Sequence, residues 1–345
     1  MREEENERLT RYAGEKLDHI MTCDVRLNFK TEKVLPALYQ RAREATNESS
    51  QNSITMTAAK KIIERVSPGD ICIVLTGWKT PYRLYGETDG HLGAVVLARA
   101  IAKACKATPV LLAEDEIANS LIPLCRIAGL NVLDLQTAKA TESSVYIKGM
   151  PIGKKESKEA SENIFNELSP SCVISVERPG RNERGVHHYN RGESCSDGIA
   201  YLDYIFEEAW RKGVLTIGIG DYGNELGLGK LQDTVKKYIK YGSMCLCPCQ
   251  GGIAASDPAE VTVFSSTSNW GAFGIAAALA ILRGDLNIFH SGEIECEMLK
   301  NCVINGVVDG ASNYPTRSVD TISEEADVGV VELMRTVIQK TVRIK

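Results

Sequence analysis

Residues 215–230 of the chain read LTIGIGDYGNELGLGK. The first half is an apolar run with β-branched residues, which predicts a short buried strand that ends at Asp221. A glycine-rich turn with Asn224 and Glu225 follows, and a helical pattern begins after it. A carboxylate at the end of a strand, beside backbone that can approach a ligand closely, is typical of α/β active sites. The segment therefore predicts an enzyme that acts on a small, polar, metal-bound substrate.

Similar apolar runs recur along the chain, and helical patterns separate several of them. They cover residues 71–77, 109–115, 131–136, 172–180, 215–221 and 261–267. Unbroken apolar strands that alternate with helices indicate a mainly parallel sheet covered by helices on both faces. We therefore predict an α/β fold, with a polar excursion over residues 137–170.

The beginning of the chain has a different pattern. Residues 3–22 and 34–45 combine helical spacing with abundant charge, and residues 54–66 read as another helix. The character changes after a Pro-Gly-Asp turn, where the strand-like runs begin. We expect a helical N-terminal region over residues 1–66, packed on an α/β catalytic domain over residues 67–345.

Composition excludes several classes of function. Hydrophobic residues make up 43% and charged residues 25%, as in an ordinary globular protein. The net charge of -5 argues against nucleic acid as a partner, because a phosphate backbone selects a basic surface. No run reaches the roughly 18 apolar residues of a membrane span, and the charged N-terminus is unlike a signal peptide. We expect a cytoplasmic protein with no membrane partner, and a homo-oligomer is compatible with the sequence.

Eleven cysteines raise the question of metal or disulfide chemistry. Most stand singly in apolar runs, as free thiols do in a reducing compartment. The exception is a segment with Cys245, Cys247 and Cys249, which share one face if it is extended. Because no CxxC spacing or second cysteine–histidine pair accompanies them, ordinary buried thiols are favoured over a structural metal.

The ends of the predicted strands supply the candidate site residues, since ligands of open α/β sheets bind beyond the carboxyl ends of the strands. The candidate catalytic residues are Asp221, Glu225 and Glu177. The candidate metal ligands are Asp89, Asp221, Glu225 and Glu87. The candidate substrate-binding residues are Arg178, Arg181, Asn224, Asn269, Trp270, Thr76 and Gly77. Because hard cations take oxygen ligands, the acids suit Mg²⁺ or Mn²⁺.

Arginines and histidines near these ends admit two interpretations each. Arg178, Arg181 and Arg191 can hold a carboxylate or phosphate through paired hydrogen bonds, which implies a small anionic substrate. Pairing with the local acids explains them nearly as well. Either His187 or His188 can act as a general acid or base. The favoured interpretation is that both are exposed loop residues, because adjacent residues rarely face one ligand.

Three named motifs are rejected. Gly218, Gly220 and Gly223 match GxGxxG, but Asp221 would repel a pyrophosphate, and the acid expected about 20 positions downstream is missing. Leu231 stands where a P-loop requires serine or threonine. No GxSxG elbow of a serine hydrolase is present. We therefore predict neither NAD nor ATP as a cofactor.

Four strand-end segments, taken in order, resemble the signature segments of the D-glutamate cyclase-like C-terminal domain family. They are ETDG (87–90), ERPGR (177–181), GDYGNELGLG (220–229) and SNWGAFG (268–274). The similarity extends over most of the chain, from about residue 24 to residue 320. Tyr222 stands where the family has a glycine, a difference that bears on the width of the pocket.

The resemblance implies reversible cyclisation of D-glutamate to 5-oxo-D-proline with loss of water, assisted by a divalent cation. In that chemistry Asp221 or Glu225 would accept the proton of the α-amine, and a cation beside them would polarise the γ-carboxyl group. Arg178 or Arg181 would bind the α-carboxylate, and Asn269 would orient the intermediate. Two alternatives stay open: a Mn²⁺- or Mg²⁺-dependent hydrolase of a small phosphorylated substrate, and a protein that binds a small anion without catalysis.

Overall fold

The structure is a computed structural model that describes residues 2–26, 32–46, 52–79 and 84–344. Its α-helices are α1 (Arg2–Met21), α2 (Val34–Thr46), α3 (Ile54–Arg65), α4 (Thr88–Cys105), α5 (Asp115–Ile127), α6 (Leu135–Ala140), α7 (Lys154–Leu168), α8 (Asp203–Arg211), α9 (Gln232–Tyr238), α10 (Ser268–Arg283), α11 (Gly292–Ile304) and α12 (Glu324–Ile344). Its strands are β1 (Ile71–Thr76), β2 (Thr108–Ala113), β3 (Asn131–Val132), β4 (Ser144–Gly149), β5 (Cys172–Val176), β6 (Leu215–Gly220), β7 (Val261–Phe264), β8 (Ser318–Val319) and β9 (Ile322–Ser323).

The main sheet has seven strands in the order β3-β4-β2-β1-β5-β6-β7, and every neighbouring pair is parallel. From β1 the chain first builds toward β2 and β4, and it then crosses to the other side of β1 for β5, β6 and β7. The strand order thus reverses between β1 and β5, which is where open α/β sheets bind ligands. The predicted α/β class is confirmed.

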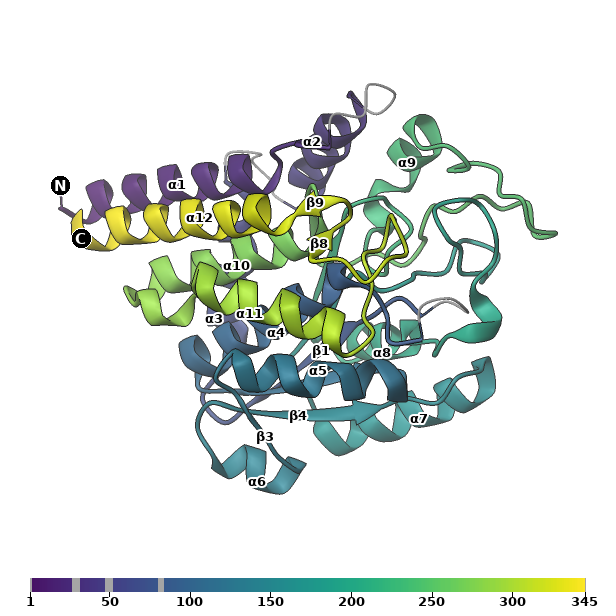
Figure 1. Cartoon of the computed structure of the whole chain (residues 1–345), viewed down its shortest axis with the longest axis horizontal. Coiled ribbons are helices and arrows are strands. Elements are labelled where there is room, and N and C mark those ends of the chain that lie inside the picture. Colours follow the sequence, from purple (N-terminus) through teal and green to yellow (C-terminus); the bar gives the residue numbers. More distant parts are fainter. Residues whose placement is uncertain (1, 27–31, 47–51, 80–83, 345) are drawn as a thin grey trace.

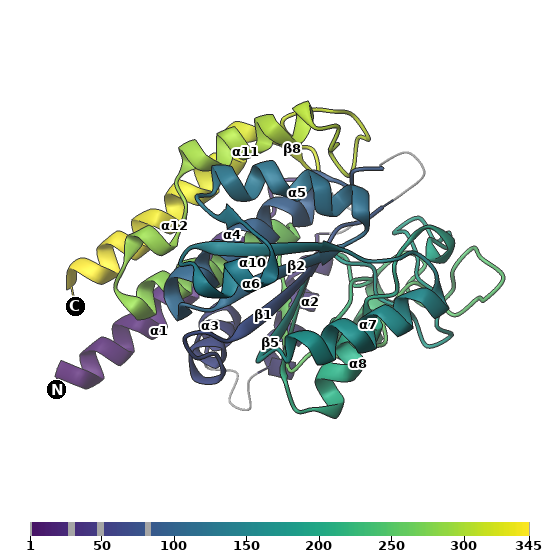
Figure 2. The same ribbon diagram turned by 90° about the horizontal axis from the view of Figure 1, so that it is seen from below.

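Helices cover both faces of this sheet because its strands are buried on both sides. Alternate residues of β1 belong to two separate apolar clusters: Cys72 and Val74 face one way, and Ile73 and Leu75 face the other. The first cluster includes α4 and α10, and the second includes α7 and α8. Figure 2 shows the two pairs of helices on opposite sides of the sheet. The prediction of two covered faces is confirmed.

The helical N-terminal region forms as predicted. Leu17 and Met21 of α1 belong to the same buried cluster as the sheet. Asp18 fixes this packing, because its carboxylate accepts hydrogen bonds from the backbone N–H groups of Ile54 (2.7 Å) and Thr55 (3.2 Å) at the start of α3. Helix α1 also runs alongside α12, so the two ends of the chain lie close together (Figure 1).

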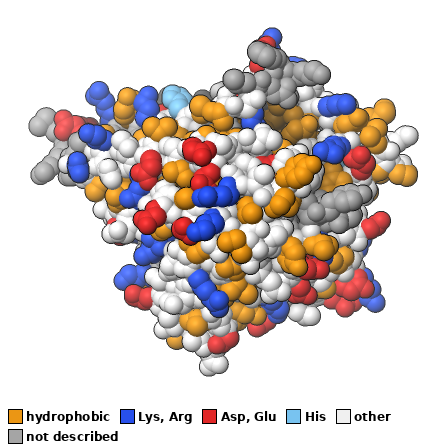
Figure 3. Space-filling view, viewed as in Figure 1, with side chains coloured by type: hydrophobic (Ala, Val, Ile, Leu, Met, Phe, Trp, Pro, Cys, Tyr) orange, Lys and Arg blue, Asp and Glu red, His pale blue; other side chains and the backbone are white. Residues whose placement is uncertain are grey.

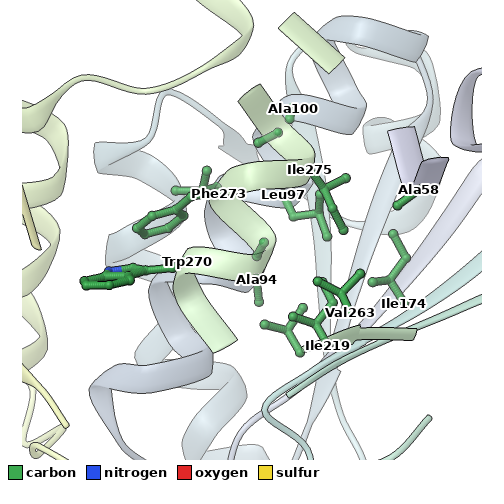
Figure 4. Close-up of a cluster of buried hydrophobic side chains, with 14 of the residues drawn as sticks. Ala58, Ala94, Leu97, Ala100, Ile174, Ile219, Val263, Trp270, Phe273 and Ile275 are labelled. Atoms are coloured by element: carbon green, nitrogen blue, oxygen red, sulfur yellow. The ribbon is translucent and has the colours of Figure 1, made fainter. Parts of the chain in front are cut away.

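Helix α10 forms the centre of the larger cluster. Its side chains meet Ile219 and Val263 of the sheet on one side, while Trp270 and Phe273 point away from the sheet (Figure 4). The indole of Trp270 is fully buried, and its Nε1 donates to Asp327 Oδ1 at 2.6 Å. Trp270 therefore belongs to the core between α10 and α12.

The polar excursion predicted over residues 137–170 is wrong. The segment contains β4 and the charged helix α7. Strand β4 reads SVYIKG, and its last four residues are only partly buried, since the short strand β3 alone lies beyond it at that edge. An unbroken apolar run, which identified the central strands, is therefore absent here.

The surface carries charges of both signs. On the face in Figure 3, acidic and basic side chains are intermixed over the region of α1 and α12. Within the described residues, no helix combines the length and apolar character needed to cross a membrane.

Candidate functional site

An acidic cluster lies at the carboxyl edge of the sheet, next to the point where the strand order reverses. Glu177 directly follows β5, Asp221 directly follows β6, and Asp89 lies at the start of α4. One carboxylate oxygen from each of the three lies within 4.8 Å of the others, and all three residues are buried. The sheet topology therefore gathers three side chains that lie far apart in the sequence.

Asp89 is held by a local break in the helix geometry. Its backbone is extended (φ -71°, ψ 142°), and Gly90 follows with φ 82°. Its carboxylate accepts from the N–H groups of Ser268 (3.0 Å) and Asn269 (2.8 Å), so it caps the start of α10. A Cβ on Gly90 would lie 2.6 Å from Cβ of Glu177. Only glycine permits this approach of α4 to the end of β5.

Glu177 has an unusual backbone conformation for a residue with a side chain. Its φ is +46°, in the left-handed region, at the sharp turn that follows β5. Ser268 Oγ donates to its Oε2 at 2.5 Å. Strained backbone of this kind occurs often at functional sites, where the surrounding contacts impose it.

Glu225 stabilises the turn that carries Asp221. Its carboxylate accepts from the backbone N–H groups of Asp221 (3.3 Å), Tyr222 (2.8 Å) and Gly223 (2.6 Å). A Cβ on Gly220 would lie 2.7 Å from Glu225 Cδ. Gly220, one of the glycines that formally match a dinucleotide motif, thus makes room for this folded-back turn. Glu225 lies outside both the acidic cluster and the lining of the adjacent pocket.

The three clustered acids hold protons more tightly than ordinary carboxyl groups. Burial raises the pKa of Asp89 and of Glu177 well above the usual range, and the charge of Asp221 adds to both shifts. Burial raises the pKa of Asp221 itself to about 7, although Arg26 opposes the shift. Three close carboxylates need a compensating cation to ionise together. Their oxygens fit Mg²⁺ or Mn²⁺, which prefer such ligands.

A pocket of about 1060 Å³ lies beside the acids. Among the described residues that line it, acidic side chains outnumber basic ones. The acidic lining residues are Asp24, Glu87, Glu177, Glu193, Asp197, Asp221 and Asp320. The basic lining residues are Arg26 and Arg191, and the lining aromatic residues are Trp78, Tyr189, Tyr222 and Phe264. A pocket with this balance favours a substrate with an ammonium group, or an anion that enters together with a metal ion.

Arg26 is a site residue to which the strand-end pattern assigned no role. Its Nη1 donates to Asp221 Oδ2 and to Asp320 Oδ2, both at 3.2 Å. Asp320 lies at the tip of the β8–β9 hairpin, where Asp320 and Thr321 have φ values of 50° and 70°. Two positive φ values in a two-residue loop are typical of a type I′ hairpin turn. The only sequence signal for Arg26 and Asp320 was that both lie within the extent of the family resemblance.

Arg178 and Arg181, expected to bind the substrate, point into the protein's own ion pairs. Arg178 forms a fully buried pair with Glu114, with an N–O distance of 2.7 Å. Arg181 pairs with Glu207 at 2.5 Å and with Asp257 at 2.9 Å. Neither arginine lines the pocket. The sequence had raised a second interpretation, in which these arginines pair with acids of the chain itself. That interpretation is correct for both arginines.

Asn269 and Trp270 also serve the scaffold. Asn269 Oδ1 accepts from the N–H groups of Gly90 (2.9 Å) and Gly93 (2.7 Å), and its Nδ2 donates to the Thr88 carbonyl at 3.0 Å. These bonds use its amide group to join α4 to α10. Trp270 lies in the core and does not reach the pocket.

Of the four other predicted residues, two line the pocket and two do not. Glu87 and Asn224 line the pocket. The Nδ2 of Asn224 donates to the His188 carbonyl at 2.9 Å. Thr76 is the last residue of β1 and Gly77 follows it; neither lines the pocket, and the Gly77 carbonyl accepts from Arg178 Nη1 at 2.9 Å.

The expectation that His187 and His188 are exposed loop residues is wrong. Both are fully buried, because the loop folds back on itself and His188 pairs with Ser194 in an antiparallel arrangement. His187 Nε2 lies 2.7 Å from Asp203 Oδ2. The expectation of ordinary buried thiols at the clustered cysteines is also only partly correct, since Cys247 is partly exposed and lies 3.2 Å from His188 Nε2.

The fold and the site are those of a doubly wound α/β protein with a buried acidic cluster at the reversal of its strand order. Residues 37–335 match the family model described as D-glutamate cyclase-like, C-terminal, and the chain belongs to that family. It is similar to the human protein named D-glutamate cyclase, mitochondrial, with 27% identity over 160 residues. The alignment covers 46% of this chain and 24% of the human protein, so it spans about a quarter of that relative.

Proposed function

We propose that the protein is a D-glutamate cyclase-like lyase that interconverts D-glutamate and 5-oxo-D-proline, with release of water on cyclisation. The observation that carries this proposal is the buried cluster of Asp89, Glu177 and Asp221 beside the pocket. Membership of the D-glutamate cyclase-like family supports the choice of substrate.

Cyclisation needs a group that moves a proton near neutral pH. The α-ammonium group must lose a proton before its nitrogen attacks the γ-carboxyl carbon. The nitrogen loses a second proton as the new C–N bond forms, and the departing γ-carboxylate oxygen takes up two protons and leaves as water. Burial raises the pKa of Asp221 to about 7 in the metal-free protein, and its carboxylate can accept each proton from the nitrogen and deliver it to the departing oxygen. The same steps in reverse open the ring of 5-oxoproline.

A divalent cation fits the acidic cluster. Asp89 and Glu177 would hold it, and Asp221 beside them would remain available to move the protons. The cation would polarise the γ-carboxyl group. It would also lower the repulsion between a substrate with two carboxylates and the acidic lining of the pocket. Mn²⁺ and Mg²⁺ both suit these ligands.

Within the described parts of the chain, the arginines that line the pocket are Arg26 and Arg191, so they replace Arg178 and Arg181 as the proposed ligands of the α-carboxylate. Arg26 bridges Asp221 and Asp320. A cation at the acids would weaken that attraction and allow the guanidinium to bind a substrate carboxylate. Holding the amine and the γ-carboxyl group close together would supply much of the acceleration.

The test is incubation of the full chain with D-glutamate and, separately, with 5-oxo-D-proline, with and without Mn²⁺. Mass spectrometry should show gain or loss of one water in both directions. L-glutamate and the Asp221→Asn variant are the matched controls. Release of phosphate from small phosphate esters without cyclisation would instead support a hydrolase. Tight binding of D-glutamate without turnover at any metal concentration would support a binding protein.

A further inference from the structure

Three cysteines and a histidine meet outside the acidic site. The Sγ atom of Cys245 lies 3.5 Å from that of Cys247 and 3.4 Å from that of Cys249. His188 Nε2 lies 3.2 Å from Cys247 Sγ and 3.5 Å from Cys249 Sγ. All four atoms lie within 4.8 Å of one another. The histidine that no sequence spacing associated with the cysteines is thus the fourth member of the group.

Four of the six distances between these atoms are close to the edge lengths of a tetrahedron around one zinc ion. With Zn–S bonds of about 2.3 Å and a Zn–N bond of about 2.0–2.1 Å, neighbouring ligand atoms lie about 3.5–3.8 Å apart. The four distances above, from 3.2 to 3.5 Å, are close to that range. Three thiolates and one imidazole form a closed ligand set, which is typical of structural rather than catalytic zinc.

A disulfide explains the group less well. The cysteines are free, and their sulfur atoms are much farther apart than the about 2.0 Å of a disulfide bond. Any disulfide among three cysteines would leave one thiol unpaired, and it would give His188 no role. Two N–H groups also point at Cys249 Sγ, from Asn182 Nδ2 (3.5 Å) and from the backbone of Gly251 (3.4 Å). Donors of this kind stabilise a thiolate ligand.

The group joins two long segments that have little regular structure. Residues 177–202 connect β5 to α8, and residues 239–260 connect α9 to β7. Irregular loops longer than about 12–15 residues are uncommon, and both segments are longer than that. Figures 1 and 2 show them together at one end of the molecule, and Leu246 N–H donates to the Gly192 carbonyl at 2.9 Å. A metal ion would cross-link the two segments.

We propose that His188, Cys245, Cys247 and Cys249 form a structural zinc site that fixes one wall of the pocket. Tyr189, which follows His188, lines the pocket. The His188 carbonyl accepts the hydrogen bond of Asn224, so the zinc site is also connected to the turn of Asp221. Binding of Zn²⁺ displaces the protons of the three thiols and leaves the oxidation state of sulfur unchanged. The proposal does not depend on the reaction that the pocket performs.

The first test is the metal content of the full chain, purified under reducing conditions with zinc in the growth medium. Elemental analysis should find about one zinc per chain, as expected for one closed site. X-ray absorption at the zinc edge should show three sulfur neighbours and one nitrogen neighbour. Because this measurement uses the unaltered protein, it gives a result even if the variants fold poorly. Absence of zinc, or a shell of oxygen and nitrogen alone, would overturn the proposal.

Variants separate this site from the acidic cluster. Cys249→Ser and His188→Ala should reduce the zinc content by at least about tenfold, since each removes one of four ligands. Cys296→Ser, at a cysteine outside the group, is the matched control and should retain zinc. Asp221→Asn should retain it as well. Loss of zinc in Asp221→Asn with retention in Cys249→Ser would place the ion at the acids and refute the cysteine site.

Discussion

Arg178 and Glu114 form a two-armed ion pair inside the protein: Nη1 and Nη2 of the guanidinium each lie 2.7 Å from a carboxylate oxygen, and neither side chain is exposed. The same guanidinium donates to the carbonyls of Gly77 (2.9 Å) and Ala200 (2.5 Å). One side chain therefore ties together the ends of β1, β2 and β5 and the segment before α8. This network fixes the end of β5, which Glu177 of the site directly follows.

Arg178→Ala should cost about 3–5 kcal/mol of stability, because it leaves the carboxylate of Glu114 buried without its partner. Urea denaturation at neutral pH measures the loss. The double variant Arg178→Met with Glu114→Gln removes both charges and should recover a large part of it. If Arg178→Ala leaves the stability unchanged and only raises KM, Arg178 binds the substrate instead of supporting the fold.

Asp221→Asn should lower kcat by about a hundredfold to ten-thousandfold, the usual contribution of a general acid or base. The amide has nearly the shape of the carboxylate but cannot accept the proton of the substrate amine. Steady-state assays with D-glutamate and Mn²⁺ measure the effect. Glu193→Gln, at an exposed acid of the same pocket, should stay within about twofold of the parent because surface charges interact weakly.

The same Asp221→Asn variant should also change how stability depends on pH when metal is absent. The folded protein raises the pKa of Asp221 from 3.8 to about 7. Its contribution to stability is therefore complete below about pH 4 and is lost as the pH rises to about 7. The asparagine variant does not lose this stability. The free energy of unfolding of the variant relative to that of the parent should therefore rise between about pH 4 and pH 7. Urea denaturation in EDTA at several pH values tests this, and parallel curves would contradict it.

Arg26→Ala should move the acidic limb of the pH–rate profile upward by about one unit, because an opposite charge near a carboxyl group lowers its pKa. Arg26 lies 3.2 Å from Asp221 and opposes the rise in the pKa of that residue. Without the guanidinium, Asp221 stays protonated to higher pH. The measurement is kcat/KM as a function of pH. Arg26→Lys keeps the charge and should restore most of the profile, and an unmoved limb would exclude the coupling.

Local sequence patterns predicted the sheet and part of the site, for a physical reason. Unbroken apolar runs identify strands buried on both faces, and the residue after such a strand lies at the carboxyl edge. Glu177 and Asp221 were found in this way. Strand β4 was missed because its partial exposure interrupts the run.

Contacts between distant segments were beyond the reach of these patterns. Nothing in the order of residues shows that Glu114, which follows β2, forms an ion pair with Arg178. The same holds for Arg26, which reaches Asp221 across the fold. His188 and the cysteines come from separate loops, so the spacing rules of metal motifs could not associate them.

Glu295→Gln should make the stability of the protein less dependent on pH, through a buried pair outside the site. Burial raises the pKa of Glu295 to about 8 and lowers that of His290 to about 3, so the pair is neutral, with Nε2 and Oε2 2.7 Å apart. The folded state keeps a proton on Glu295 that the unfolded chain releases near pH 4.5, so the stability from this group falls as the pH rises from about 4.5 to about 8. Glutamine stays neutral throughout. The free energy of unfolding at pH 5 and pH 8 should therefore differ less in the variant, by at least about 1 kcal/mol. Glu293→Gln, at an exposed acid of the same helix, is the control and should keep the pH dependence of the parent's free energy of unfolding. The same pH dependence in the parent and both variants would show that Glu295 is charged in the folded protein.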